Sequence, residues 1–160
     1  MTLGTSMGLG RDELDALYRG AFIHDIGKIA IPDRLLLKKG KLTRAEHALM
    51  KQHTIIGDDL CRTVRSLEAV RPIVRHHHER LDGRGYPDGL KGDEIPLLAR
   101  VVGVVDVFDA LTTDRPYRKA MNVDAALHLM RTDARAGWCD PSLVEAFVDV
   151  LPAKLHKSVA

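Results

Sequence analysis

The chain has 160 residues, a length that predicts one domain with a buried core. Apolar residues make up 45% and charged residues 29%, which excludes a disordered chain, and a formal net charge of +2 gives no general nucleic-acid-binding surface. The two cysteines form no CxxC pair, so we expect no disulfides. The longest uncharged apolar run (101–105) is far short of the roughly 20 residues that span a bilayer, so we expect no membrane segment. Together with the low net charge, these features predict a cytoplasmic protein that has no nucleic-acid polymer as partner.

Helical periodicity dominates the first half of the chain. Apolar residues at spacings of three and four predict an amphipathic helix over about 14–22 that leads into His24. Thr43 and Glu46 have the spacing of a capping box, which predicts a helix start there and places His53 on that helix. A further helix is expected over 60–78, although Pro72 makes its start uncertain.

The second half begins with a glycine-rich stretch, 81–95, that predicts an irregular loop. Pro96 is suited to open a helix that runs through Asp106 to Leu111, and further helices are expected over 123–131 and 142–151. The valines between 101 and 105 favour a strand in isolation, but the sequence offers no partner strand. We therefore predict an all-α helical bundle.

Several histidines and aspartates have the character of metal ligands, since imidazole and carboxylate suit Fe, Mn, Zn or Ni. Neighbouring helical side chains diverge by about 100°, so an adjacent pair does not readily chelate one ion but can serve two ions about 4 Å apart, bridged by a carboxylate. Two such pairs are present, and two further segments add one residue each. The candidates are His24, Asp25, His53, His77, His78 and Asp106.

Four segments in order carry a family resemblance: HDIGK at 24–28, HHERLDGRGYP at 77–87, DVFDALT at 106–112 and DRPYR at 114–118. Over roughly residues 12–150 the chain resembles an HD-GYP domain, a branch of the HD phosphohydrolase superfamily. The resemblance implies an all-α domain that hydrolyses cyclic di-GMP to pGpG or GMP, using two or three metal ions that are often iron or manganese. The residues Glu79-Arg80 that follow the run of three histidines select His77 and His78, rather than His76, as the motif pair.

The resemblance also implies roles for the candidate ligands. One divalent ion would be held by His24, Asp25 and Asp106. The second would be held by Asp25, as a bridge, with His53, His77 and His78. A hydroxide between the two ions would attack the phosphorus, because paired cations lower the pKa of water and absorb charge on the phosphoryl oxygens.

Basic residues and a loop complete the implied site. Lys28 would neutralise the scissile phosphate or the leaving oxygen, and Arg115 and Arg118 match substrate-binding positions, where guanidinium groups suit phosphate or guanine. In the family, the loop that Gly85-Tyr86-Pro87 resembles has a proposed contact with diguanylate cyclase (GGDEF) domains, but we favour a structural role for it here. Asp109 is either a partner of a metal ligand or a surface carboxylate, and the sequence does not decide between them.

The N-terminal side departs from the family, whose members carry a further helix that supplies another histidine ligand. Only 23 residues precede His24 and none is a histidine. We expect a single domain, 1–160, that is truncated at its N-terminal side: either a fragment with a sensor or receiver domain upstream, or a short form with weakened activity. Loss of that helix should expose an apolar face that promotes self-association, with a homodimer as one form of it.

Two other functions compete with the phosphodiesterase. The first is a catalytically weak or inactive cyclic di-GMP receptor or protein-interaction module, which the missing ligand favours. The second is an HD hydrolase for a related cyclic dinucleotide or a nucleotide, which the GYP segment disfavours.

Overall fold

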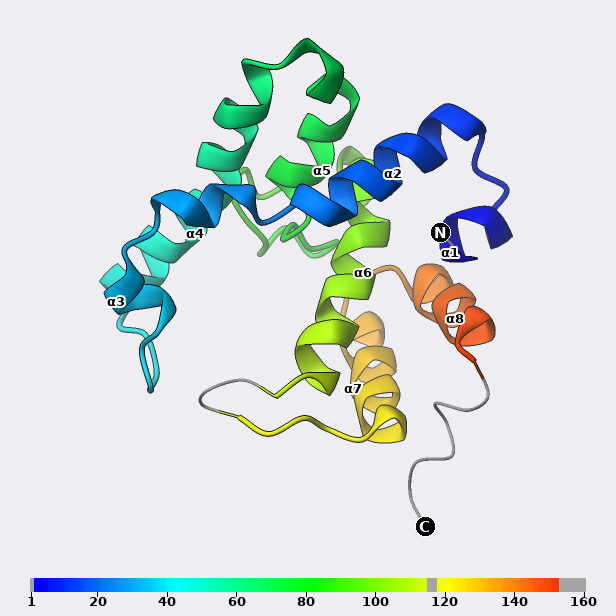
Figure 1. Ribbon diagram of the computed structural model, residues 1–160. Helices are drawn as coiled ribbons and strands as arrows, with labels where there is room; N and C mark the ends of the chain where they lie inside the picture. Colours follow the sequence, from blue (N-terminus) through cyan, green and yellow to red (C-terminus); the bar gives the residue numbers. More distant parts are fainter. Residues whose placement is uncertain (1, 115–117, 153–160) are drawn as a thin grey trace.

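The computed structural model describes residues 2–114 and 118–152 and consists of helices joined by short connections (Figure 1). The described residues contain no β-strand, which confirms the all-α prediction. The elements are α1 (Thr2–Ser6), α2 (Arg11–Ile23), η1 (Ile26–Ala30), α3 (Asp33–Leu36), α4 (Arg44–Arg62), η2 (Arg65–Val70), α5 (Arg71–His76), η3 (Gly92–Glu94), α6 (Leu97–Thr112), α7 (Val123–Arg135) and α8 (Pro141–Val150).

Helix α6 forms the centre of the molecule (Figure 1). It packs against α2 and α5 on one part of its length and against α7 and α8 on another. Its buried residues are Ala99, Val101, Val102 and Val104. The three valines join the main apolar core. The valines that favour a strand in isolation are therefore helical, because helices surround them and no neighbouring strand is available to pair with them.

Two of the predicted helix starts, at Thr43 and at Pro96, agree with the structure. The Thr43 hydroxyl accepts from the backbone N–H of Glu46 at 3.3 Å, and the Glu46 carboxylate accepts from the backbone N–H of Thr43 at 2.7 Å. Pro96 directly precedes α6 as expected. These signals are local, since they involve residues no more than three apart, and so the sequence is sufficient to place them.

The single helix predicted over 60–78 is wrong. Helix α4 ends at Arg62, the chain passes through η2, and α5 begins at Arg71 with Pro72 in its first turn. Proline is tolerated there because the first N–H groups of a helix lack intrahelical partners. Helix α5 ends at His76, so His77 and His78 lie at its C-terminal end instead of within a helix.

The short helix α1 was not predicted. It packs against α2 and α8, and Leu3 is buried in the main core. A second, smaller core joins α4, η2 and α5 through Cys61, Val70 and Val74. None of the helices within the described part of the chain is long and apolar enough to cross a membrane.

Candidate metal centre

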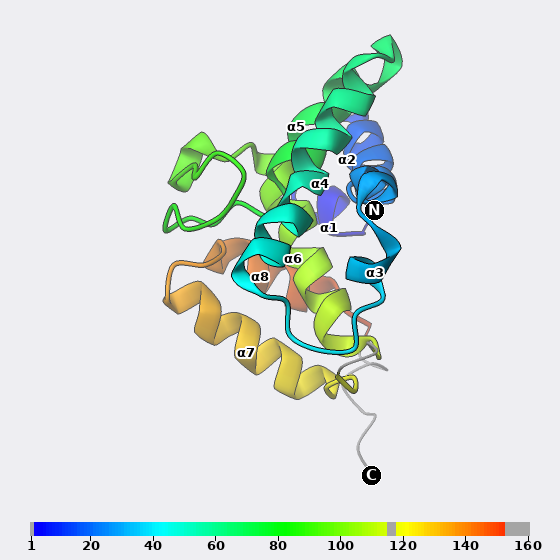
Figure 2. The ribbon, with the colours of Figure 1, turned by 90° about the vertical axis from the view of Figure 1, so that its left-hand side faces the viewer.

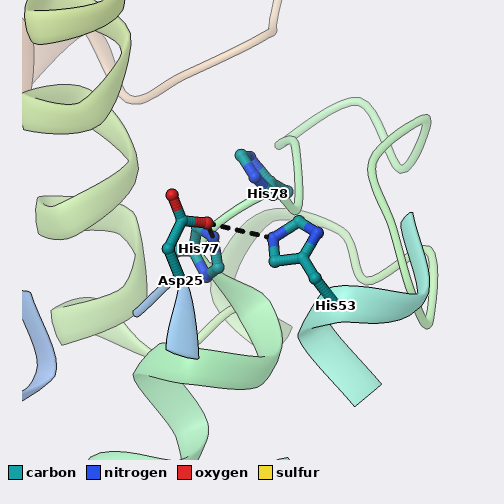
Figure 3. Close-up of side chains that lie close together, drawn as sticks. All are labelled: Asp25, His53, His77 and His78. Atoms are coloured by element: carbon teal, nitrogen blue, oxygen red, sulfur yellow. Dashed lines mark ion pairs between the residues drawn. The ribbon is translucent and has the colours of Figure 1, made fainter. Parts of the chain in front are cut away.

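The six candidate ligands come from separate parts of the chain and meet between α4, α5 and α6. His24 and Asp25 lie between α2 and η1, His53 lies on α4, and Asp106 lies on α6. Ligand atoms of Asp25, His53, His77 and His78 all lie within 4.8 Å of one another, and Figure 3 shows these four side chains pointing toward a common centre. The 81–95 loop lies on the side of α4 opposite to α2 (Figure 2).

Two glycines permit the backbones to approach closely enough for this convergence. A Cβ atom on Gly27 would lie 1.9 Å from the carbonyl oxygen of His53, so η1 is pressed directly against α4. A Cβ atom on Gly103 would lie 2.7 Å from the carbonyl oxygen of His77, so α6 approaches the end of α5. Any larger residue at either position would separate the elements that carry the candidate ligands.

Three of the imidazoles are oriented by backbone carbonyls. Nδ1 of His24 lies 2.7 Å from the carbonyl oxygen of Ala21, and Nδ1 of His53 lies 2.8 Å from that of Met50. Nδ1 of His77 lies 2.9 Å from the carbonyl oxygen of Val74. Since Nδ1 must carry the proton to donate, Nε2 keeps its lone pair in each ring, as in histidines that bind metal ions through Nε2.

The Asp25 carboxylate faces two groups of histidines. Its Oδ1 lies 3.3 Å from Nε2 of His53 and 3.9 Å from Nε2 of His77, whereas its Oδ2 lies 3.5 Å from Nε2 of His24. His24 Nε2 also lies 3.7 Å from Oδ1 of Asp106. The carboxylate therefore connects the His53 side of the cluster to the His24 side.

Orphaned polar atoms show that this cluster fits a divalent cation. Oδ1 of Asp25, Nε2 of His53 and Nε2 of His77 are buried and have no hydrogen-bond partner among the described residues. Buried polar atoms are normally paired, because leaving one unpaired costs about 1–3 kcal/mol. A divalent cation bound to imidazole and carboxylate would satisfy all three atoms at once.

The carboxyl groups of the cluster are held in their anionic form. Burial alone would raise the pKa of Asp106, but the neighbouring imidazoles of His24, His78 and His77 outweigh burial and lower it to about 2. Burial acts likewise on Asp25, where the hydrogen bond and charge of Lys28 prevail and lower the pKa. Both groups are therefore charged at neutral pH, as a cation site requires.

Most of the imidazoles are held neutral. Burial, followed by the neighbouring histidines, lowers the pKa of His77 to about 4 and that of His78 to about 3, and burial also lowers the pKa of His53. For His24, burial is outweighed by Asp106, by the Ala21 carbonyl and by Asp25, and its pKa is raised. Three lone pairs are thus available at neutral pH without the release of a proton.

These shifts predict that protein freed of metal by EDTA loses stability as the pH falls from 7 to 5. The pKa values of His53, His77 and His78 are lower in the folded chain than in the unfolded one, so the unfolded chain binds more protons below about pH 6.5. The raised pKa of His24 acts in the opposite sense, but it is one group against three. Thermal melts at pH 7, 6 and 5 measure the effect; a melting temperature that stays constant or rises on acidification would contradict it.

The basic residues predicted for the site have different positions. The Lys28 ammonium donates to Oδ2 of Asp25 at 2.5 Å and therefore lies at the cluster. The Arg118 guanidinium donates to the carbonyl oxygen of Ala110, one turn of α6 beyond Asp106. Arg115 lies outside the described residues.

The remaining motif residues also have defined places. In the Gly85-Tyr86-Pro87 loop, the Tyr86 ring lies 4.8 Å from that of His78 and 6.4 Å from that of His53, between ring centroids. Asp109 lies on α6 and lines a groove together with Asp106. Tyr86, for which the sequence favoured a structural role, therefore lies directly beside two of the candidate ligands.

Beside His24 and Asp106 lies an apolar groove of about 320 Å³. It is lined mainly by residues of α1, α2 and α6, including Leu17 and Val102, and Tyr18 and Phe22 are exposed close to it along α2. Apolar surface therefore adjoins the His24 side of the metal cluster. The self-association that such a face should promote stays a prediction.

A second group of possible ligands has a structural role instead. His76, Glu79 and Asp88 also offer atoms within 4.8 Å of one another. Both oxygens of Asp88, however, accept from the Arg75 guanidinium at 2.8 Å. The Glu79 carboxylate accepts from three backbone N–H groups. A guanidinium thus neutralises Asp88, and backbone amides occupy the Glu79 oxygens, so both carboxylates already have partners within the chain.

The sequence matches a known protein family and is similar to proteins of named function. The sequence profile described as HD domain matches residues 2–143. The cyclic di-GMP phosphodiesterase response regulator RpfG of Xanthomonas campestris pv. campestris (strain 8004) is 47% identical over 144 residues, which cover 89% of this chain and 38% of that protein. The 3'3'-cGAMP-specific phosphodiesterase 1 of Vibrio cholerae serotype O1 is 36% identical over 146 residues, which cover 91% of this chain and 34% of that protein.

A solved structure agrees in fold. Bd1817, a HDG"Y"P protein from Bdellovibrio bacteriovorus, matches with a TM-score of 0.74 and 23% identity, over 93% of this chain and 47% of that chain. The chain spans between 34% and 47% of the length of these relatives. From the profile match, the motif series and the common fold, the chain belongs to the HD domain family, in its HD-GYP branch.

Proposed function

We propose that this chain hydrolyses the phosphodiester bond of cyclic di-GMP, giving pGpG or GMP. The observation that carries the proposal is the convergence of Asp25, His53 and His77, whose buried ligand atoms have no partner among the described residues. The names of relatives such as RpfG, a cyclic di-GMP phosphodiesterase, support the choice of substrate. A site of anionic carboxylates and neutral imidazoles suits phosphodiester hydrolysis, which needs cations to offset charge on the phosphoryl oxygens.

We further propose that the site holds two divalent ions, with iron or manganese as the leading candidates. His24, Asp25 and Asp106 would hold one. Asp25, His53, His77 and His78 would hold the other. Such ions supply a nucleophilic water of lowered pKa and stabilise charge on the transferred phosphoryl group.

Other residues of the chain would act on the substrate directly. The Lys28 ammonium lies beside Asp25, where it would balance charge on the scissile phosphate or the leaving oxygen. Arg115 and Arg118 are proposed to bind phosphate or guanine, for which their planar guanidinium groups are suited. An intracellular nucleotide as substrate implies a cytoplasmic location. Contact of the Gly85-Tyr86-Pro87 loop with a GGDEF domain stays a prediction.

Turnover by metal-reconstituted protein tests the proposal. We expect anaerobic protein loaded with Fe(II) or Mn(II) to convert cyclic di-GMP to pGpG or GMP. The proposed ligands are imidazoles and carboxylates, with no thiolate, and such a set suits these ions. EDTA should abolish the conversion and added metal should restore it. Metal analysis of the same samples gives the number of ions per chain, and chromatography of the products gives the reaction.

Two results would overturn parts of the proposal. Nucleotide binding without hydrolysis at full metal loading would support the receptor function instead. Faster turnover of 3'3'-cGAMP than of cyclic di-GMP would correct the substrate, since a relative is specific for that nucleotide by name. Both substrates should therefore be assayed side by side.

A further inference from the structure

His78 differs from the other histidines of the cluster in how its ring is oriented. His24, His53 and His77 each have Nδ1 within hydrogen-bond distance of a backbone carbonyl three residues earlier. No such carbonyl is found for His78 among the described residues. Its ring packs instead among other rings, with centroid separations of 4.1 Å to His77, 4.8 Å to Tyr86 and 5.2 Å to His53; the interplanar angle with Tyr86 is 33°. Of these three neighbours Tyr86 is the one that is not itself a candidate ligand, so its ring can orient His78 from outside the ligand set.

Tyr86 can orient His78 only if its own backbone is fixed. On one side, the backbone N–H of Tyr86 donates to the carbonyl oxygen of His78 at 3.3 Å. A Cβ atom on Gly85 would lie 2.4 Å from the backbone nitrogen of Arg80 and 2.4 Å from the Cα of Glu79. The loop therefore folds back directly onto the chain that follows the histidine pair.

On the other side of Tyr86 the loop is held by one carboxylate. Oε1 of Glu79 accepts from the backbone N–H of Asp88 at 2.7 Å and of Gly89 at 3.0 Å. Oε2 accepts from the backbone N–H of Leu90 at 3.1 Å. Hydrogen bonds to an ionised acceptor are about twice as strong as neutral ones, so three consecutive amides are fixed by one side chain.

A second contact fixes the same turn to α5. The Arg75 guanidinium donates to both oxygens of Asp88 at 2.8 Å, and Arg75 also lies 3.4 Å from Asp58 of α4. This contact holds the Asp88 side chain, whereas Glu79 holds the backbone two to four residues after Tyr86. Glu79 is therefore the group that fixes the path of the loop next to the tyrosine.

We propose that Glu79 is a positioning residue for the metal centre: its carboxylate anchors the 88–90 backbone, so that the Tyr86 ring keeps His78 in the orientation needed to bind metal. The proposal rests on the metal centre of the proposed function and adds a residue that lies outside its ligand set. Partners that orient metal ligands typically contribute about 10–100-fold to metal affinity or activity.

Glu79→Gln tests this, because glutamine has the same size but presents an NH2 donor where an amide N–H needs an acceptor. We expect the amides of 88–90 to exchange hydrogen at least about tenfold faster, while those of α6 are unchanged. Mn2+ affinity, measured by titration calorimetry, should fall by about 10–100-fold. If Glu79→Gln fails to fold, Glu79→Asp gives the same test, since the shorter side chain cannot reach all three amides.

A double-mutant cycle separates positioning from general destabilisation. Tyr86→Ala should lower Mn2+ affinity as Glu79→Gln does, and the double variant should lose no more than Tyr86→Ala alone, because both act through one ring. Glu145→Gln is the matched control. Glu145 lies on α8, and its carboxylate accepts from the Arg131 guanidinium of α7 at 2.8 and 2.7 Å. Its replacement should leave hydrogen exchange of the 88–90 amides and the Mn2+ affinity unchanged.

Unchanged protection of the 88–90 amides in Glu79→Gln, or additive losses in the double variant, would overturn the inference. Wild-type protein that binds Mn2+ but hydrolyses no cyclic dinucleotide would refute the proposed activity and leave both readouts in place. Wild-type protein that binds no Mn2+ would refute the metal centre, and this inference with it.

Discussion

Asp25→Asn should reduce metal-dependent turnover of cyclic di-GMP by at least about 10²–10³-fold, the range seen when one group that stabilises a transition state is removed. Asp25 is the only described carboxylate that faces both parts of the cluster, with one oxygen toward His53 and the other toward His24. Asparagine keeps the shape but loses the charge and offers one oxygen instead of two. We therefore expect the variant to bind at least one metal ion fewer per chain than the wild type.

Metal analysis and initial rates on the same preparation measure both effects. Asp59→Asn is the matched control, because Asp59 forms only an exposed ion pair with Arg62 within α4 and such pairs contribute little. Equal metal content and equal rates for Asp25→Asn and wild type would refute the assignment of the bridging carboxylate.

Gly27→Ala should be the most damaging glycine-to-alanine change among the described residues, because its added Cβ makes the shortest contact. The added Cβ would lie 1.9 Å from the carbonyl oxygen of His53 and 2.6 Å from the backbone nitrogen of Gly57. Both atoms belong to the backbone of α4, which cannot rotate away as a side chain can. We expect the free energy of unfolding to fall by about 3 kcal/mol or more. For a domain of this size, that lowers the melting temperature by about 6–12 °C.

The same separation of η1 from α4 should weaken Mn2+ binding, because Asp25 immediately precedes η1 and His53 lies on α4. Circular dichroism melts and metal titrations measure the two effects. Gly40→Ala is the control, since a Cβ there meets no atom within 4 Å. A Gly27→Ala variant as stable as Gly40→Ala would show that η1 and α4 are not in such close contact.

The sequence was sufficient for the helical class and for most helix starts. Thr43 and Glu46 cap α4, and Pro96 precedes α6, because capping depends on residues within one turn of each other. The sequence was not sufficient for the break between α4 and α5. Periodic apolar residues continue across 60–78, and only the packing of η2 and α5 against α4 selects two helices over one.

For the metal centre, the sequence and its family resemblance identified the residue types, while the tertiary structure decided which atoms face one another. That Oδ1 of Asp25 faces His53, and that Glu79 anchors the loop beside His78, follows from contacts no pattern in the sequence describes. Asp25 and His53 are brought together by the contact of Gly27 with the backbone of α4 at His53. Gly27 and His53 are 26 residues apart in the sequence. Local signals such as caps and periodicity act over one or two turns, and they cannot specify contacts between backbones so far apart in the chain.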